Sequence, residues 1–170
     1  MHLIVEGIDR TGKSSSIQAM LKLLPDYTVS KPRPPKSHDD ARHIYSEFFQ
    51  ELAEPGNVIH DRGHISELVY SRLYRTYNPM GWILDLEAEV AKQNPFIKII
   101  YFFPIWGNLL KDDDRPGADR TAELYLYESC LNMSVLSVTR QRVHELASRS
   151  TWLTPEVRAG RALRACGVLP

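Results

Sequence analysis

The sequence predicts an α/β fold in which a parallel sheet of about five strands lies between two layers of helices. Short apolar runs of strand type alternate with longer segments whose apolar residues recur at helical spacing. A glycine-rich turn joins the first of these strands to the first helix. The 170 residues suffice for one domain with a substantial core, so we expect a single domain over residues 1–170.

The first half of the chain is predicted to hold three strands and three helices. The helices are recognised by apolar residues on one stripe, and they end at turns that contain proline, glycine or asparagine. We expect helices over residues 13–24, 39–53 and 63–77, and strands over residues 2–6, 27–30 and 57–60.

The second half begins with a predicted helix over residues 82–93. Residues 97–103 form the most strand-like run of the chain, because they are β-branched and aromatic. Residues 121–147 are predicted as a long helical stretch with at most one break. Residues 151–153 are predicted as a last short strand.

A final helix is predicted from Thr154 and Pro155. Threonine caps a helix N-terminus well, and proline suits the first helical position. Arg158, Arg161 and Arg164 recur every three residues on this helix, and we expect them to form a solvated face.

The turn after the first strand has the spacing G-x-x-x-x-G-K-S, which places Gly7, Gly12, Lys13 and Ser14 at its fixed positions. The glycines let the backbone fold around a polyphosphate, and the following helix adds its positive N-terminal end. Lys13 would neutralise phosphate oxygens, and the Ser14 hydroxyl would bind Mg²⁺. Strand, turn and helix follow in the order that this chemistry needs, so the motif predicts a phosphate-binding P-loop.

Asp61 and Arg62 stand at the end of the third predicted strand. The carboxylate of Asp61 can reach Mg²⁺ directly or through water, and Arg62 can bind a phosphate through two hydrogen bonds. The alternative is a structural Asp–Arg pair at a strand end. A P-loop in the same chain favours the functional interpretation.

Three other segments allow both a structural and a functional interpretation. The basic, proline-rich residues 31–36 form either a rigid surface loop or a site where Arg33 or a lysine meets an anionic acceptor. Most aromatic residues of the helix over 39–53 belong to the core, although one could face a nucleobase. The charged residues 111–120 form either a solvated loop or a mobile lid.

The composition is ordinary for a soluble globular protein, with 43% apolar and 25% charged residues and a formal net charge of zero. A neutral chain lacks the electrostatic footprint of an obligate DNA binder. Cys130 and Cys166 have no metal-ligand spacing, so we expect reduced thiols and a cytoplasmic protein. We expect no signal peptide, and no apolar run approaches the ~20 residues of a membrane span.

These motifs carry a resemblance to the thymidylate kinases. Residues 6–15, Glu-Gly-Ile-Asp-Arg-Thr-Gly-Lys-Ser-Ser, resemble that family's P-loop pattern E-G-x-D-x-x-G-K-S/T. Asp61 and Arg62, followed by Ser66 and Tyr70, are similar to its D-R-Y-x-x-S-x-x-A-Y stretch. The run Phe-Phe-Pro at 102–104 is placed like the family's strand end before the lid. The resemblance implies a P-loop kinase three-layer sandwich.

The resemblance also implies roles for individual residues. Asp9 resembles the P-loop carboxylate close to the acceptor nucleotide's sugar, and Arg10 resembles the arginine that assists transfer in one subgroup. Arg115 and Arg120 fall where the family has lid arginines. The implied catalytic residues are Asp9, Arg10, Lys13, Asp61 and Arg62; the donor nucleotide would meet Gly7, Gly12, Lys13, Ser14, Ser15, Arg115 and Arg120, and the metal Ser14 and Asp61.

The implied function is ATP- and Mg²⁺-dependent phosphoryl transfer to a pyrimidine deoxynucleotide, foremost dTMP. Short kinases of this kind are familiar from bacteriophages, so a viral source is expected, and the protein could form a homodimer. One alternative is a phage kinase that phosphorylates 5-hydroxymethyluracil bases within DNA. Another is a regulatory module that binds ATP without turnover. Gly63 stands where the family has a tyrosine, and the family's acceptor motif F-A-x-N-R is not recognisable.

Overall fold

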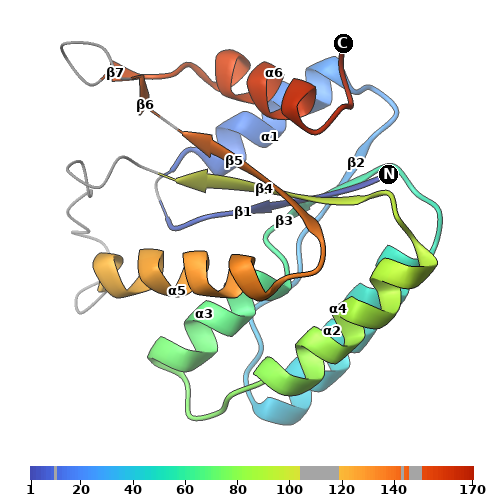
Figure 1. The fold of residues 1–170 in the computed structure, drawn as a ribbon, viewed down its shortest axis with the longest axis vertical. Coiled ribbons are helices and arrows are strands. Elements are labelled where there is room, and N and C mark those ends of the chain that lie inside the picture. The colour runs from blue at the N-terminus through green and yellow to red at the C-terminus, as the bar shows by residue number, and fades with distance from the viewer. Residues whose placement is uncertain (10, 104–118, 143, 146–150) are drawn as a thin grey trace.

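A parallel sheet of five strands forms the centre of the fold in a computed structural model that describes residues 1–9, 11–103, 119–142, 144–145 and 151–170 (Figure 1). The strands follow the order β2-β3-β1-β4-β5, and each pairs in parallel with its neighbours. Because β1 is the middle strand, the P-loop leaves the sheet at the centre of its carboxyl edge. The strands are β1 (His2–Glu6), β2 (Thr28–Ser30), β3 (Val58–Asp61), β4 (Ile97–Phe103) and β5 (Ser137–Arg142).

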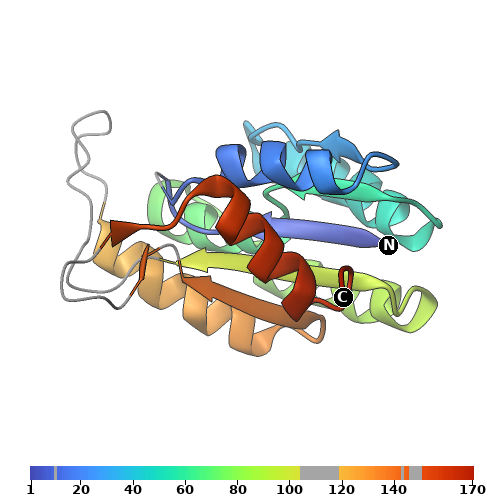
Figure 2. The same ribbon diagram turned by 90° about the horizontal axis from the view of Figure 1, so that it is seen from above.

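Helices cover both faces of the sheet (Figures 1 and 2). Two helices, α1 and α6, lie side by side on one face, and the other four cover the opposite face. Each face has its own apolar cluster, and both clusters contain fully buried residues of β1 and β4. The helices are α1 (Lys13–Leu23), α2 (His38–Ala53), α3 (His64–Tyr74), α4 (Met80–Gln93), α5 (Arg120–Met133) and α6 (Pro155–Ala165). The predicted α/β sandwich is confirmed.

The long helix predicted over residues 121–147 is wrong in its second half. Helix α5 ends at Met133, and Ser137–Arg142 form β5, the edge strand beside β4. Val138 and Thr139 are β-branched and pair with Ile99 and Ile100 of β4, which favours a strand here. The polar residues around them prevented recognition of this strand from the sequence. An edge strand pairs with only one other strand and therefore tolerates polar side chains.

The strand predicted over residues 151–153 does not belong to the main sheet. Thr151–Trp152 form β7, which pairs antiparallel with β6 (His144–Glu145) in a separate two-stranded sheet. Of the lid predicted over 111–120, the structure describes only Asp119 and Arg120; the other residues of that segment lie outside the described part of the chain. In the part of the chain that the structure describes, no helix has the length and apolar character needed to cross a membrane.

Two buried histidines, His2 of β1 and His60 of β3, are hydrogen-bonded to each other. The His2 Nε2 atom lies 2.9 Å from the carbonyl oxygen of Glu54, so Nε2 must carry the proton. The His2 Nδ1 atom then accepts a hydrogen bond from His60 Nε2 at 3.1 Å. This leaves His60 Nδ1 as a buried atom without a hydrogen-bond partner, 4.0 Å from the carboxylate of Glu51. Burial, with the nearby charges of His2 and His64, lowers the pKa of His60 to about 3.

We therefore expect the free energy of unfolding to fall as the pH is lowered from about 6.5 towards 3. In this window the unfolded chain binds a proton at His60 that the folded chain does not, which costs roughly 1.4 kcal/mol per pH unit. Urea unfolding at pH 7.5 and 5.5 measures the change. His60→Phe should flatten this pH dependence, whereas replacing the exposed His43 by asparagine should not. Equal slopes for wild type and His60→Phe would contradict the assignment.

Candidate active site

The P-loop begins with a glycine that the fold requires. Gly7 has φ 137°, and a Cβ atom placed there would lie 2.3 Å from the carbonyl oxygen of Phe102. Any other residue would therefore push the loop away from β4. Within the loop, the Thr11 hydroxyl donates a hydrogen bond to the carbonyl oxygen of Ile8 at 2.9 Å and closes the turn.

The N-terminus of α1 has the features of an anion-binding site. Gly12 is its N-cap in the left-handed conformation, with φ 74°, and no side chain caps it. Its first turn contains no acidic residue, whereas α2, α5 and α6 are capped by Ser37, Asp119 and Thr154. The backbone N–H groups at the start of α1 are thus left for a phosphate, which fits the donor nucleotide expected at this loop.

Lys13 extends along the inside of this loop. Its side chain is largely buried, with the residue 6% exposed, and Nζ donates a hydrogen bond to the carbonyl oxygen of Ile8 at 2.6 Å. Burial and the neighbouring charge of Arg62 lower the pKa of Lys13 to about 7. A phosphate group beside Nζ would favour its charged form.

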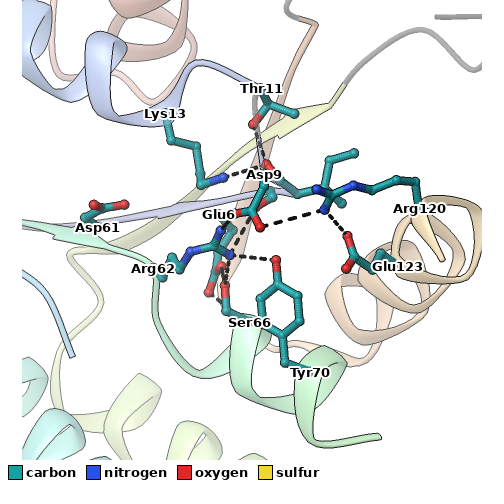
Figure 3. A network of polar contacts seen from close by, with 12 residues as sticks. Glu6, Asp9, Thr11, Lys13, Asp61, Arg62, Ser66, Tyr70, Arg120 and Glu123 are labelled. Atoms are coloured by element: carbon teal, nitrogen blue, oxygen red, sulfur yellow. Dashed lines mark hydrogen bonds and ion pairs between the residues drawn. The ribbon is translucent and has the colours of Figure 1, made fainter. Parts of the chain in front are cut away.

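Arg62 is held in a strained backbone conformation at the end of β3. Its φ of 75° lies in the left-handed region, which costs a non-glycine residue about 1 kcal/mol. Its backbone N–H donates to the carbonyl oxygen of Val5 at 3.0 Å. Its guanidinium pairs with the carboxylate of Asp9 and donates a hydrogen bond to the hydroxyl of Tyr70 at 3.0 Å (Figure 3). It also donates a hydrogen bond to the hydroxyl of Tyr127 at 3.2 Å.

Glu6 connects β1 to the start of α3. It is fully buried, and one of its carboxylate oxygens accepts hydrogen bonds from the backbone N–H groups of Gly63 at 3.0 Å and Ser66 at 3.2 Å. The Ser66 hydroxyl donates to the other oxygen (Figure 3). The carboxylate thus does for α3 what a capping side chain does for other helices, and it holds Arg62 close to the P-loop.

Asp61 and Arg62 do not pair with each other. The Asp61 carboxylate binds the Lys31 ammonium group at 2.7 Å, which comes from the basic segment 31–36. Together these residues line a pocket of about 370 Å³, a size typical of small-molecule sites. Its lining consists of Asp9, Gly12, Lys13, Ser14, Ser15, Lys31, Asp61 and Arg62.

The pocket also offers donors suited to Mg²⁺. Ser14 and Asp61 both line it and present the oxygen ligands that Mg²⁺ prefers. Among the described residues no group of three acidic, histidine or cysteine side chains could hold a metal ion. That is compatible with Mg²⁺, which takes only one or two protein ligands and completes its shell with phosphate oxygens and water.

A second hollow of about 310 Å³ adjoins this pocket and shares Lys31 with it. It lies between the segment after β2 and helix α2, and its lining includes Arg33 and Phe48. Arg33 is already paired with Asp40, through hydrogen bonds of 2.5 and 2.7 Å. Ile4 and Phe48 leave no room for a side chain at Gly63, because a Cβ atom there would lie 2.6 Å from the side chain of Ile4 and 3.1 Å from that of Phe48.

Of the other arginines expected in the site, the structure describes only Arg120. Arg120 is the first residue of α5; it pairs with Glu123 at 2.7 Å and lies 3.8 Å from the Asp9 carboxylate (Figure 3). Arg120 and Arg62 thus approach Asp9 from different elements. Arg10 and Arg115 lie outside the described residues.

The solvated face predicted for the arginines of α6 is wrong at Arg158. Arg161 and Arg164 are exposed, but Arg158 is only 4% exposed and packs against the P-loop. Its Nε donates to the Ser16 hydroxyl at 2.9 Å and its Nη2 to the Ser15 hydroxyl at 3.0 Å. The sequence did contain a sign that Arg158 is buried, because it lies four residues before Ala162, on the buried apolar stripe of α6.

The five-stranded parallel sheet with a P-loop after its central strand is the fold of the P-loop kinases. Among the solved structures that share it is the YorR protein of Bacillus subtilis in complex with phosphorylated GDP, with a TM-score of 0.65 over 84% of this chain and 85% of that chain, at 21% identity. Polyphosphate kinase 2 of Arthrobacter aurescens aligns with a TM-score of 0.57 over 98% of this chain and 67% of its own, at 13% identity.

A thymidylate kinase, that of Ehrlichia chaffeensis, shares the fold over 98% of both chains, with a TM-score of 0.54 and 12% identity. No protein-family model and no curated protein sequence matches the chain. The chain therefore has a thymidylate-kinase-like fold, and the likeness is one of structure.

Proposed function

We propose that this protein transfers the γ-phosphoryl group of ATP to a nucleotide, with a pyrimidine deoxynucleoside monophosphate such as dTMP as the expected acceptor. The proposal depends on one observation: Lys13 of the P-loop and Asp61 and Arg62 at the end of β3 line one pocket. Phosphoryl transfer needs mainly positioning and neutralisation of charge, and these side chains supply both.

Each residue has a distinct part in this proposal. The N–H groups at the start of α1 and the Lys13 ammonium bind the donor's phosphates, and Ser15 lies beside them. Arg62 offers its guanidinium at the position where donor and acceptor phosphates meet, while Asp9 orients that guanidinium. Ser14 and Asp61 would hold Mg²⁺, which supplies charge neutralisation on the phosphate oxygens. Lys31 must then leave Asp61, with which it is paired at 2.7 Å.

The hollow beside α2 supports a nucleotide acceptor, because it adjoins the P-loop pocket at Lys31 and has the aromatic side chain of Phe48 in its wall. Two structural neighbours support the same class. The YorR structure holds phosphorylated GDP, and another neighbour is a thymidylate kinase. The basic segment 31–36 would then act on an anionic acceptor through Lys31 rather than through Arg33, which is bound to Asp40.

The test is a panel of acceptors assayed with labelled ATP and Mg²⁺. The panel contains the common nucleosides, ribo- and deoxynucleoside monophosphates, and DNA that contains 5-hydroxymethyluracil. We expect label on a nucleoside monophosphate, with dTMP among the best. Label on the modified DNA alone would replace the proposal by the DNA-base kinase. ATP binding without transfer to any acceptor would favour a regulatory module.

A further inference from the structure

The guanidinium of Arg158 is buried against the phosphate-binding loop from the opposite end of the chain. Helix α6, which carries it, lies beside α1 on one face of the sheet (Figures 1 and 2). Three nitrogens of the side chain are used: Nη1 donates to the carbonyl oxygen of Leu153 at 2.7 Å, Nε to Ser16 and Nη2 to Ser15. Arg158 therefore joins the start of α6 to the first turn of α1.

The partners of Arg158 are all neutral. Among the residues that the structure describes, no carboxylate lies within 4.0 Å of its guanidinium, and Glu156 on its own helix is the acidic residue whose charge acts on its pKa. Burial lowers the pKa of Arg158, although an arginine stays charged at neutral pH. A buried charge without an opposite charge is costly. Its position at the positive end of the α1 dipole adds to this cost.

The contact with Gly12 shows how closely Arg158 supports the loop. A Cβ atom on Gly12 would lie 2.5 Å from Arg158 Nη2. The Ser15 and Ser16 hydroxyls, which accept from Arg158, both donate to the carbonyl oxygen of Gly12, at 2.9 and 2.8 Å. Ser15 and Gly12 line the P-loop pocket, so Nη2 is one hydrogen bond away from it.

We propose that Arg158 is a positioning residue of the donor site. It holds the Ser15 and Ser16 hydroxyls on the Gly12 carbonyl, which keeps the first turn of α1 open towards a polyphosphate. Its charge lies behind that turn and is compensated when the donor's phosphates are bound. The inference rests on the proposed use of ATP and assigns to α6 a part in holding the donor.

The test measures binding of Mg·ATP and of inorganic tripolyphosphate to the full chain by calorimetry. We compare Arg158→Met, which removes the charge and keeps most of the length, with Arg158→Lys, which keeps the charge and loses the fork. Arg164→Met is the matched control, because Arg164 is an exposed arginine of the same helix. We expect Arg158→Met to raise both dissociation constants about 10- to 100-fold, equivalent to the loss of one or two charge-assisted hydrogen bonds. Arg158→Lys should rescue part of this loss, and Arg164→Met should change neither constant.

The outcomes separate the inference from the proposed function. A wild-type protein that binds neither ATP nor tripolyphosphate would refute the kinase assignment itself. Normal binding by a folded Arg158→Met variant, or a loss confined to ATP with tripolyphosphate unaffected, would overturn the role of Arg158.

Ser16→Ala provides a second path if Arg158→Met does not fold. Ser16 is buried and does not line the pocket, but it accepts from Arg158 Nε. We expect this variant to weaken tripolyphosphate binding about 3- to 10-fold, and its effect should not add to that of Arg158→Lys, because both changes remove one interaction. Fully additive effects, or unchanged binding in Ser16→Ala, would contradict the inference.

Discussion

Lys13→Ala is expected to lower the rate of phosphoryl transfer by about 10³-fold or more, with the fold preserved. The Lys13 ammonium is a buried charged group of the P-loop, and groups of this kind act on charge that develops in the transition state. Among the described residues, its ammonium group donates a hydrogen bond to the backbone carbonyl oxygen of Ile8, and the Lys13 side chain belongs to neither apolar core.

The stability of this variant follows from the environment of Lys13. Burial lowers the pKa of its ammonium group to about 7, so the folded protein disfavours the charge that alanine removes. The free energy of unfolding should therefore stay within about 1 kcal/mol of the wild type at pH 7. Transfer assays measure the loss of activity, and urea unfolding measures the free energy of unfolding. The exposed Lys22 of the same helix is the control position. Near-normal turnover in a folded variant would refute the P-loop assignment.

Arg62→Lys is expected to lower kcat about 10²-fold with a smaller change in the KM for ATP. Lysine keeps the positive charge, but it cannot pair with Asp9 while it also reaches the hydroxyls of Tyr70 and Tyr127. An interaction that matters most in the transition state appears mainly in kcat.

Arg62→Gly separates the chemistry from the backbone strain. Glycine adopts the φ of 75° at no steric cost, so this variant relieves the strain while it removes the guanidinium. We expect it to fold and to be less active than Arg62→Lys. The exposed Arg72 of α3 serves as the control. Activity in Arg62→Gly close to that of the wild type would show that Arg62 serves the turn alone.

Local patterns were enough to predict four of the five strands of the sheet and the P-loop. The runs that became β1, β3 and β4 are apolar because each lies between two other strands, and the spacing of Gly7, Gly12 and Lys13 reflects backbone chemistry within a few residues. In contrast, β5 is an edge strand with polar side chains, so neither its composition nor its periodicity distinguished it from the preceding helix.

The pairing of side chains in the site could not be predicted from spacing. Asp61 and Arg62 are neighbours in sequence, yet the first binds Lys31 and the second binds Asp9. The burial of Arg158 could be inferred from its spacing, but its contacts with Ser15 and Ser16 could not, since these serines lie more than 140 residues earlier in the chain.

The buried carboxylate of Glu6 bears on how sequences of this fold can vary. The glycine–lysine pattern that is used to recognise such loops starts at Gly7 and treats the preceding position as free. In this protein that position accepts hydrogen bonds from Gly63 and Ser66, which stand about 60 residues later. Two of these donors are backbone N–H groups, so an apolar residue at position 6 would leave them without an acceptor whatever residue stands at position 66. Position 6 is thus restricted to side chains that accept hydrogen bonds, although the glycine–lysine pattern does not record it.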